Sequence, residues 1–247
     1  MLTEIYLPEG LSHVGRQAFN TICVVNGFQT YVGPSRMYDI HIPSTLKYID
    51  AFAFANAANI YTRFVNAALI QAGTRSGNLE HCHECNIWKL KVDGKPDVIV
   101  PKSIDSTSYA SKIANKINTA FGLTKKGKSL TDNAVSKAVI PPELYQYSQD
   151  STGLTAALEQ CRKYPGSSLK QFITKNISTI FYNLITSPTS SNGEEIMVSL
   201  IKDGVFTETA LKKLLKEIEG SACKENLITL KAYILDTIKP KNNTFKV

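Results

Sequence analysis

Several features typical of enzymes are scarce or missing in this chain. Its four histidines all precede residue 84, so the last two thirds have little capacity for acid–base chemistry. No nucleophile elbow, phosphate-binding glycine loop or zinc-protease helix motif occurs in the sequence. We therefore expect a protein that is not an enzyme.

Long apolar runs are also missing. None approaches the roughly 18 residues that a membrane-spanning helix needs, and the first residues lack the basic and apolar stretches of a signal peptide. We expect no membrane partner, and a location in the cytoplasm or within a virion or another large assembly.

The cysteines are few and odd in number. The five of them do not suggest a disulfide framework and fit a reducing compartment; they stand at positions 23, 82, 85, 161 and 223.

A repeat is present at the N-terminus. Residues 2–19 return in altered form at residues 38–54, and a shift of 35 residues superposes seven apolar or proline positions: Ile5 on Ile40, Leu7 on Ile42, Pro8 on Pro43, Leu11 on Leu46, Val14 on Ile49, Ala18 on Ala53 and Phe19 on Phe54. Each copy predicts a short strand with apolar residues at period two, a proline, a polar turn and a closing Ala-Phe pair. Such a unit cannot bury its apolar face alone, so the copies should stack.

These residues resemble the leucine-rich repeats of the bacterial surface-antigen type, which share the strand ending in proline and the Ala-Phe pair. The resemblance covers about the first 60 residues and implies protein–protein recognition. The usual period of that family is about 23 residues, so this chain holds a surplus, which we place between Asn20 and Met37. Its strand composition and its Asn26-Gly27 pair predict an inserted β-hairpin.

The next segments are expected to be mixed. Residues 51–72 are rich in alanine and lack proline and glycine, which predicts a helix ending at Gly73. Residues 87–92 and 97–100 predict a hairpin turning at Asp93-Gly94. The second of these strands could instead be a degenerate third repeat, because Val98-Ile99-Val100-Pro101 echoes Ile40-His41-Ile42-Pro43.

Residues 106–142 predict a helical hairpin. Segment 111–139 resembles the helix-turn-helix of recombinase-type DNA-binding domains, with a Thr-Lys-Lys-Gly-Lys loop between its helices. The resemblance implies a recognition helix capped by Thr131, with Asp132, Asn133, Ser136 and Lys137 facing a groove and Lys125, Lys126 and Lys128 neutralising phosphates. The net charge of +7 permits a nucleic-acid partner. The alternative is an ordinary helical hairpin with a solvated lysine loop.

Cys82 and Cys85 have the spacing of a zinc knuckle. They form only half a site, and no second pair follows. Plain reduced cysteines and a redox pair remain the alternatives; apart from a possible zinc ion, we expect no cofactor.

The sequence as a whole predicts an α+β protein. Residues 1–105 should form the repeat-like β-rich module, residues 106–142 a linking helical hairpin, and residues 143–247 an α-helical bundle, since apolar residues there recur at helical spacing. We expect a non-enzymatic interaction or assembly component that binds a protein partner or a further copy of itself, with DNA binding through residues 111–139 as the alternative.

Overall fold

The computed structural model describes residues 3–19, 23–25, 28–30, 37–75, 84–104, 106–123, 140–148, 150–186, 193–223 and 225–239. The chain divides into two compact units, Met1–Lys163 and Tyr164–Val247. It contains strands and helices and is therefore an α+β protein, as predicted. The division differs from the expected boundaries at residues 105 and 142, because the helix over residues 107–120 packs against the helix over residues 67–72, and the helix over residues 150–163 packs against the strands over residues 87–92 and 98–101.

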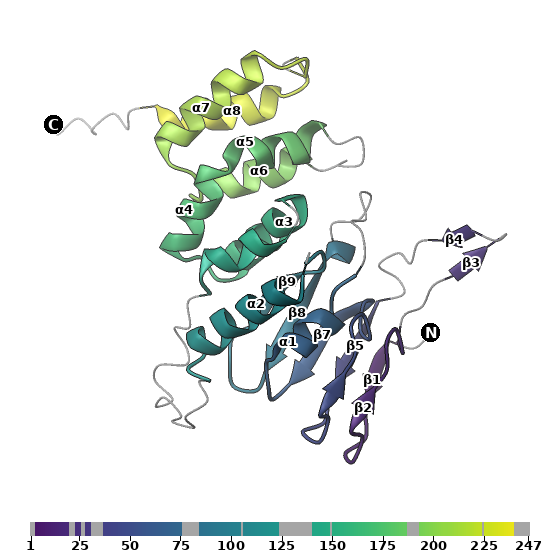
Figure 1. The fold of residues 1–247 in the computed structure, drawn as a ribbon. Coiled ribbons are helices and arrows are strands. Elements are labelled where there is room, and N and C mark those ends of the chain that lie inside the picture. Colours follow the sequence, from purple (N-terminus) through teal and green to yellow (C-terminus); the bar gives the residue numbers. More distant parts are fainter. Residues whose placement is uncertain are drawn as a thin grey trace. The chain divides into compact units, whose positions relative to one another are not determined.

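A sheet forms the centre of the first unit (Figure 1). Within the described residues its strand order is β1-β5-β7-β8-β9, and each pair is parallel except the last. The strands are β1 (Glu4–Tyr6), β5 (Tyr38–His41), β7 (Ala57–Thr62), β8 (Ile87–Val92) and β9 (Val98–Pro101).

The register of the strands confirms the repeat. Ile5 pairs with Ile40 in the main sheet, and Val14 pairs with Ile49 between β2 (His13–Val14) and β6 (Tyr48–Ile49), so both pairs keep the offset of 35 residues. The backbone repeats as well: Gln17 and Phe52, also 35 apart, both have positive φ angles, of 58° and 63°. Two stacked copies of one unit therefore open the chain.

Residues 57–62 correct the prediction of a helix over residues 51–72. They form strand β7, in which Ile60 and Thr62 are buried while Asn59 and Tyr61 are half-buried. Only Ala67–Ala72 is helical (α1), capped by Asn66 and ended at Gly73 as expected. Pairing with β5 and β8 outweighs the high helix propensity of the alanines.

Both predicted hairpins are present. Strands β3 (Cys23–Val25) and β4 (Phe28–Thr30) pair antiparallel within the insert. Strand β9 runs antiparallel to β8, so the alternative that residues 98–101 form a third repeat is wrong. Gly94 has a φ of +67° at the turn, a conformation that glycine adopts without strain.

Two longer helices complete the first unit; the first packs against α1 and the second against β8 and β9. Helix α2 (Thr107–Ala120) is capped by Ser106, whose Oγ accepts a hydrogen bond from the Tyr109 N–H, and it buries Ile113 and Ile117. Helix α3 (Asp150–Lys163) packs against β9. The 3₁₀ segments Glu84–Asn86 and Pro142–Tyr147 connect these elements.

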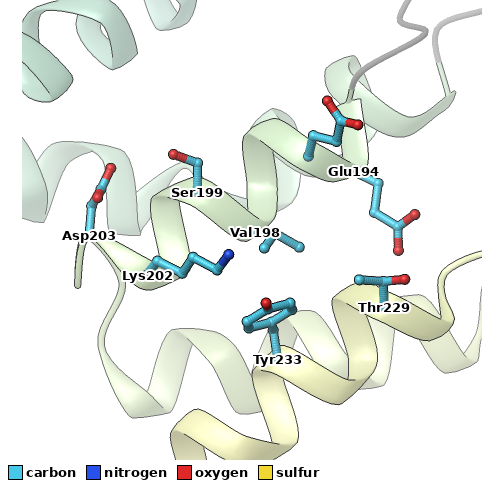
Figure 2. A pocket seen from close by; sticks show the side chains of 8 residues that line it. Glu194, Val198, Ser199, Lys202, Asp203, Thr229 and Tyr233 are labelled. Carbon is cyan, nitrogen blue, oxygen red and sulfur yellow. The ribbon is translucent and has the colours of Figure 1, made fainter.

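The second unit is helical. Its elements are α4 (Ser167–Lys175), α5 (Ile177–Phe181), a π-helical turn (Tyr182–Thr186), α6 (Gly193–Lys202), α7 (Glu208–Glu219) and α8 (Ile228–Ile238). A groove lies between α6 and α8 (Figure 2). Two of its charged groups have structural roles: Glu194 accepts a hydrogen bond from Leu230 N–H at the start of α8, and Lys202 Nζ lies 4.7 Å from the centre of the Tyr233 ring. Among the described residues, no helix combines the length and apolarity needed to cross a bilayer.

Lys102 brings an amine into the core of the first unit. Its side chain is 2% exposed, and Nζ donates a hydrogen bond to the Ala55 carbonyl oxygen at 2.8 Å. Burial, reinforced by the charge of Arg75, lowers the pKa of Lys102 well below its usual range.

We expect Lys102→Met to make the stability of the first unit less dependent on pH. At pH values between the folded and unfolded pKa values of Lys102, the unfolded chain binds one more proton than the folded chain. The contribution of Lys102 to the free energy of unfolding therefore rises with pH, by at most about 1.4 kcal/mol per pH unit. Denaturant unfolding at about pH 6 and about pH 9 can be followed by the fluorescence of the single tryptophan, Trp88. The free energy of unfolding of the variant, relative to the wild type, should be higher at about pH 6 than at about pH 9. An equal change at both pH values would contradict the expectation.

Candidate functional site

The candidate site is the face of the main sheet that points away from the core. Strand alternation sends Ile5, Ile40, Ile60 and Leu90 inward, and the residues on either side of each point outward. Because the registers match, the outward residues form two rows across the strands: Glu4, Asp39, Asn59 and Lys89 in one, and Tyr6, His41, Tyr61 and Lys91 in the other. We call these eight residues the ring-and-charge face.

The second row contains a stack of rings. The centres of Tyr6 and His41 lie 4.1 Å apart with 13° between the ring planes, and His41 and Tyr61 lie 4.1 Å apart at 6°. Lys91 Nζ, 6.0 Å from the centre of Tyr61, closes one end. At the other end, Tyr6 is 67% exposed. The stacking fixes the ring positions before any ligand arrives, which lowers the entropic cost of binding.

Glu4 holds the first two rings. Its Oε1 accepts a hydrogen bond from Tyr6 Oη at 2.7 Å and lies 2.9 Å from His41 Nε2. The hydrogen bond from Tyr6, with that from His41, lowers the pKa of Glu4; the same bond raises the pKa of Tyr6. Glu4 therefore stays ionised and Tyr6 stays protonated over the physiological range.

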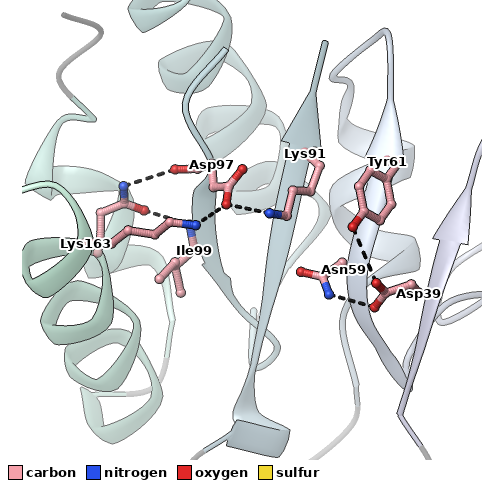
Figure 3. A network of polar contacts seen from close by, with 8 residues as sticks. Asp39, Asn59, Tyr61, Lys91, Asp97, Ile99 and Lys163 are labelled. Atoms are coloured by element: carbon pink, nitrogen blue, oxygen red, sulfur yellow. Dashed lines mark hydrogen bonds and ion pairs between the residues drawn. The ribbon is translucent and has the colours of Figure 1, made fainter. Parts of the chain in front are cut away.

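Asp39 holds the third ring (Figure 3). Asn59 Nδ2 donates to its Oδ1 at 2.6 Å, and Tyr61 Oη donates to its Oδ2 at 3.4 Å. Burial, followed by the charge of Asp39, raises the pKa of Tyr61. Each carboxylate of the face thus orients side chains on a neighbouring strand as well as carrying charge.

The β8 end of the face is basic. Asp97 accepts hydrogen bonds from Lys91, at 2.6 Å, and from Lys163 on α3 (Figure 3). Burial raises the pKa of Asp97, but the hydrogen bonds and charges of Lys163 and Lys91 outweigh it, so the pKa is lowered overall. With the exposed Lys89, three lysines face one carboxylate here, whereas the β1 end carries Glu4 and Asp39. The face is therefore acidic at one end and basic at the other.

The predicted zinc ligands are not brought together among the described residues. Cys82 lies outside them, and Cys85, which is 1% exposed, is disulfide-bonded. The disulfide corrects the expectation that all five cysteines are reduced; Cys161 and Cys223 are thiols. In the part of the chain that the structure describes, no three His, Cys, Asp or Glu residues are grouped so that they could hold a metal ion. Zinc is held by thiolates, so a site that uses Cys85 requires the reduced protein and stays a prediction for that state.

The predicted DNA-contacting residues lie outside the described residues: Lys125, Lys126, Lys128, Thr131, Asp132, Asn133, Ser136 and Lys137. The structure places only the first helix of that pattern, α2, whose apolar side is buried on the first unit. DNA binding through this segment stays a prediction.

Sequence reasoning missed the ring-and-charge face. The repeat offset already aligned Tyr6 with His41 and Glu4 with Asp39, and that signal could have shown a stacked pair. Tyr61 could not be added while residues 57–62 were expected to be helical. Comparison with protein-family models, curated proteins and solved structures finds no match for this chain.

Proposed function

We propose that the chain is a non-enzymatic protein-interaction component whose ring-and-charge face binds an extended segment of a partner protein. The observation that carries this proposal is the stack of Tyr6, His41 and Tyr61 on the outward face of a sheet, where Tyr6 is exposed and the other two rings are half-buried. Glu4 and Asp39 fix the rings. Planar side chains held in place give large contact areas at low entropic cost, as protein-binding surfaces require.

The charges define the kind of segment that fits. A basic side chain suits the Glu4 and Asp39 end, and an acidic side chain suits the end with Lys89, Lys91 and Lys163. The resemblance of the first 60 residues to leucine-rich repeats supports the same proposal, because that family is known for protein recognition. For the location we propose the cytoplasm or a large assembly such as a virion; the disulfide at Cys85 favours the assembly, since disulfides persist poorly in the reducing cytoplasm.

We expect a peptide library, selected on the immobilised protein, to yield peptides with a basic end and an acidic end. The double variant Asp39→Ala/Tyr61→Ala should weaken their binding at least about tenfold in calorimetric titration, which corresponds to about 1.4 kcal/mol. The interior strands that carry these residues keep their buried Ile40 and Ile60, so folding should persist and can be checked by thermal unfolding.

Tyr48→Ala/Asp50→Ala is the matched control. It removes the same two residue types from exposed positions in the second repeat, with Tyr48 on β6 in a different sheet. This control should bind the peptides like the wild type. Equal losses in both double variants, or no selectable peptide, would argue against the proposal.

A further inference from the structure

The two edges of the main sheet differ in whether their outward backbone groups have hydrogen-bond partners. At β9 the side chain of Gln160 stands in for a neighbouring strand, since its Oε1 accepts from the Ile99 N–H at 2.7 Å and its Nε2 donates to the Asp97 carbonyl oxygen at 3.1 Å. At β1, no strand among the described residues lies on the outer side. Open edges invite further pairing, and proteins commonly block those they do not use.

The backbone groups on the outer side of β1 can be identified. Thr3 C=O and Leu7 N–H are bonded to β5, at 2.9 Å and 3.1 Å. In a parallel ladder alternate residues bond to one side, so the N–H and C=O groups of Glu4 and Tyr6 point away from β5. Among the described residues, none provides a hydrogen bond to these four groups.

The side chains of the first repeat are also less covered than their equivalents one layer further in. Ile5, Leu7, Leu11 and Phe19 are half-buried, whereas the exposed fractions at the matching positions are 0% for Ile40, 8% for Ile42, 5% for Leu46 and 0% for Phe54. The end layer thus presents apolar side chains beside an open strand edge, a combination that favours protein association.

The edge is complementary to itself. If two β1 strands pair antiparallel about Ile5, Glu4 faces the partner's Tyr6, and Tyr6 faces the partner's Glu4. Each of these pairs exchanges two backbone hydrogen bonds, which makes four in all, and Ile5 packs on the partner's Ile5. Parallel pairing in register would instead set Glu4 against the partner's Glu4, which is unfavourable.

We infer that two copies of this chain associate through antiparallel pairing of their β1 edges. The arrangement has two-fold symmetry, so each copy contributes the same surface. It joins the two ring-and-charge faces into one continuous surface. It uses the outer backbone groups of β1, whose Glu4 and Tyr6 side chains belong to that face, but it does not depend on peptide binding. Because the paired strands are short, we expect a dissociation constant of about 1–100 µM.

Sedimentation velocity over about 1–300 µM tests this inference on three proteins. The wild type should pass from monomer to dimer. Tyr6→Pro removes an N–H that points away from β5, and edge strands tolerate proline; it should weaken dimerisation at least about tenfold. Tyr6→Ala loses the ring but keeps the N–H, so it should lie between the two. A wild type that stays monomeric, or a Tyr6→Pro that dimerises like the wild type, overturns the inference.

Hydrogen exchange of the wild type avoids any dependence on how the variants fold. The amides of Glu4 and Tyr6 should become protected at least about tenfold as the concentration rises through the dimer transition, while the interior Ile40 amide should not change. A dimer without this protection would use another surface. Protection already present in the monomer would mean that the edge is covered within the chain. Either result overturns the inference.

Discussion

Replacing Gln160 with leucine is expected to lower the free energy of unfolding of the first unit by about 2–4 kcal/mol. The Gln160 side chain is 2% exposed and satisfies the Ile99 N–H and the Asp97 carbonyl oxygen, where a strand would otherwise be needed. Leucine has a similar volume but neither accepts nor donates a hydrogen bond, so the Ile99 N–H would lose its partner, the Gln160 amide oxygen on α3. The cost is that of a desolvated backbone group without a hydrogen bond.

Fluorescence of Trp88 during denaturant unfolding measures this loss. Trp88 is the single tryptophan and lies buried in β8, so its signal reports on the first unit alone. Glu159→Gln is the matched control, because it changes the adjacent residue of α3, whose exposed carboxylate pairs only with Arg162 on the same helix among the described residues; it should shift stability by less than about 0.5 kcal/mol. If Gln160→Leu matched this control, Gln160 would not be what closes the β9 edge.

Gly153→Ala is expected to lower the free energy of unfolding of the same unit by about 1–3 kcal/mol. A Cβ atom on Gly153 would lie 2.3 Å from the Tyr145 carbonyl oxygen and 2.4 Å from Ser148 Oγ. One of these contacts is with backbone, so relief requires α3 to shift against the segment before it. That shift would also move Gln160 away from β9 and couple the two effects.

Gly15→Ala provides the comparison for this variant. A Cβ atom there meets nothing within 4 Å, and its φ lies outside the left-handed region. The control should leave the Trp88 unfolding midpoint almost unchanged. Similar midpoints for the two variants would show that α3 can move away from Tyr145 at little cost.

The sequence predicted the repeat well because the signal is carried by side chains that meet in space. Residues 35 apart resemble one another since Ile5 and Ile40 fill adjacent positions of one apolar row, and the observed register is that offset. Strand β7 gave no such signal. It pairs with β5 at an offset of 20 residues, through Ile60 and Ile40, and its alanines favoured a helix.

The candidate site was harder to predict than the fold. Its rows depend on β7 and β8 joining the stack, and the contacts of Asp97 and Gln160 join residues 63 positions apart. Local periodicity describes which face of an element is apolar, but not which distant side chain will meet it. For the same reason the cysteine spacing could not show that Cys85 forms a disulfide, which depends on geometry that the fold creates.

Photo-crosslinking from the ring-and-charge face tests the central claim most directly. A photoreactive amino acid placed at the exposed Lys89 lies in the row with Asp39 and Asn59, and the same group at Tyr48 samples a different sheet. With a peptide selected on the protein, we predict a covalent adduct from position 89, lost in the Asp39→Ala/Tyr61→Ala background, and none from position 48. Equal adducts from both positions, or adducts from position 48 alone, would show that the face of stacked rings is not the binding surface.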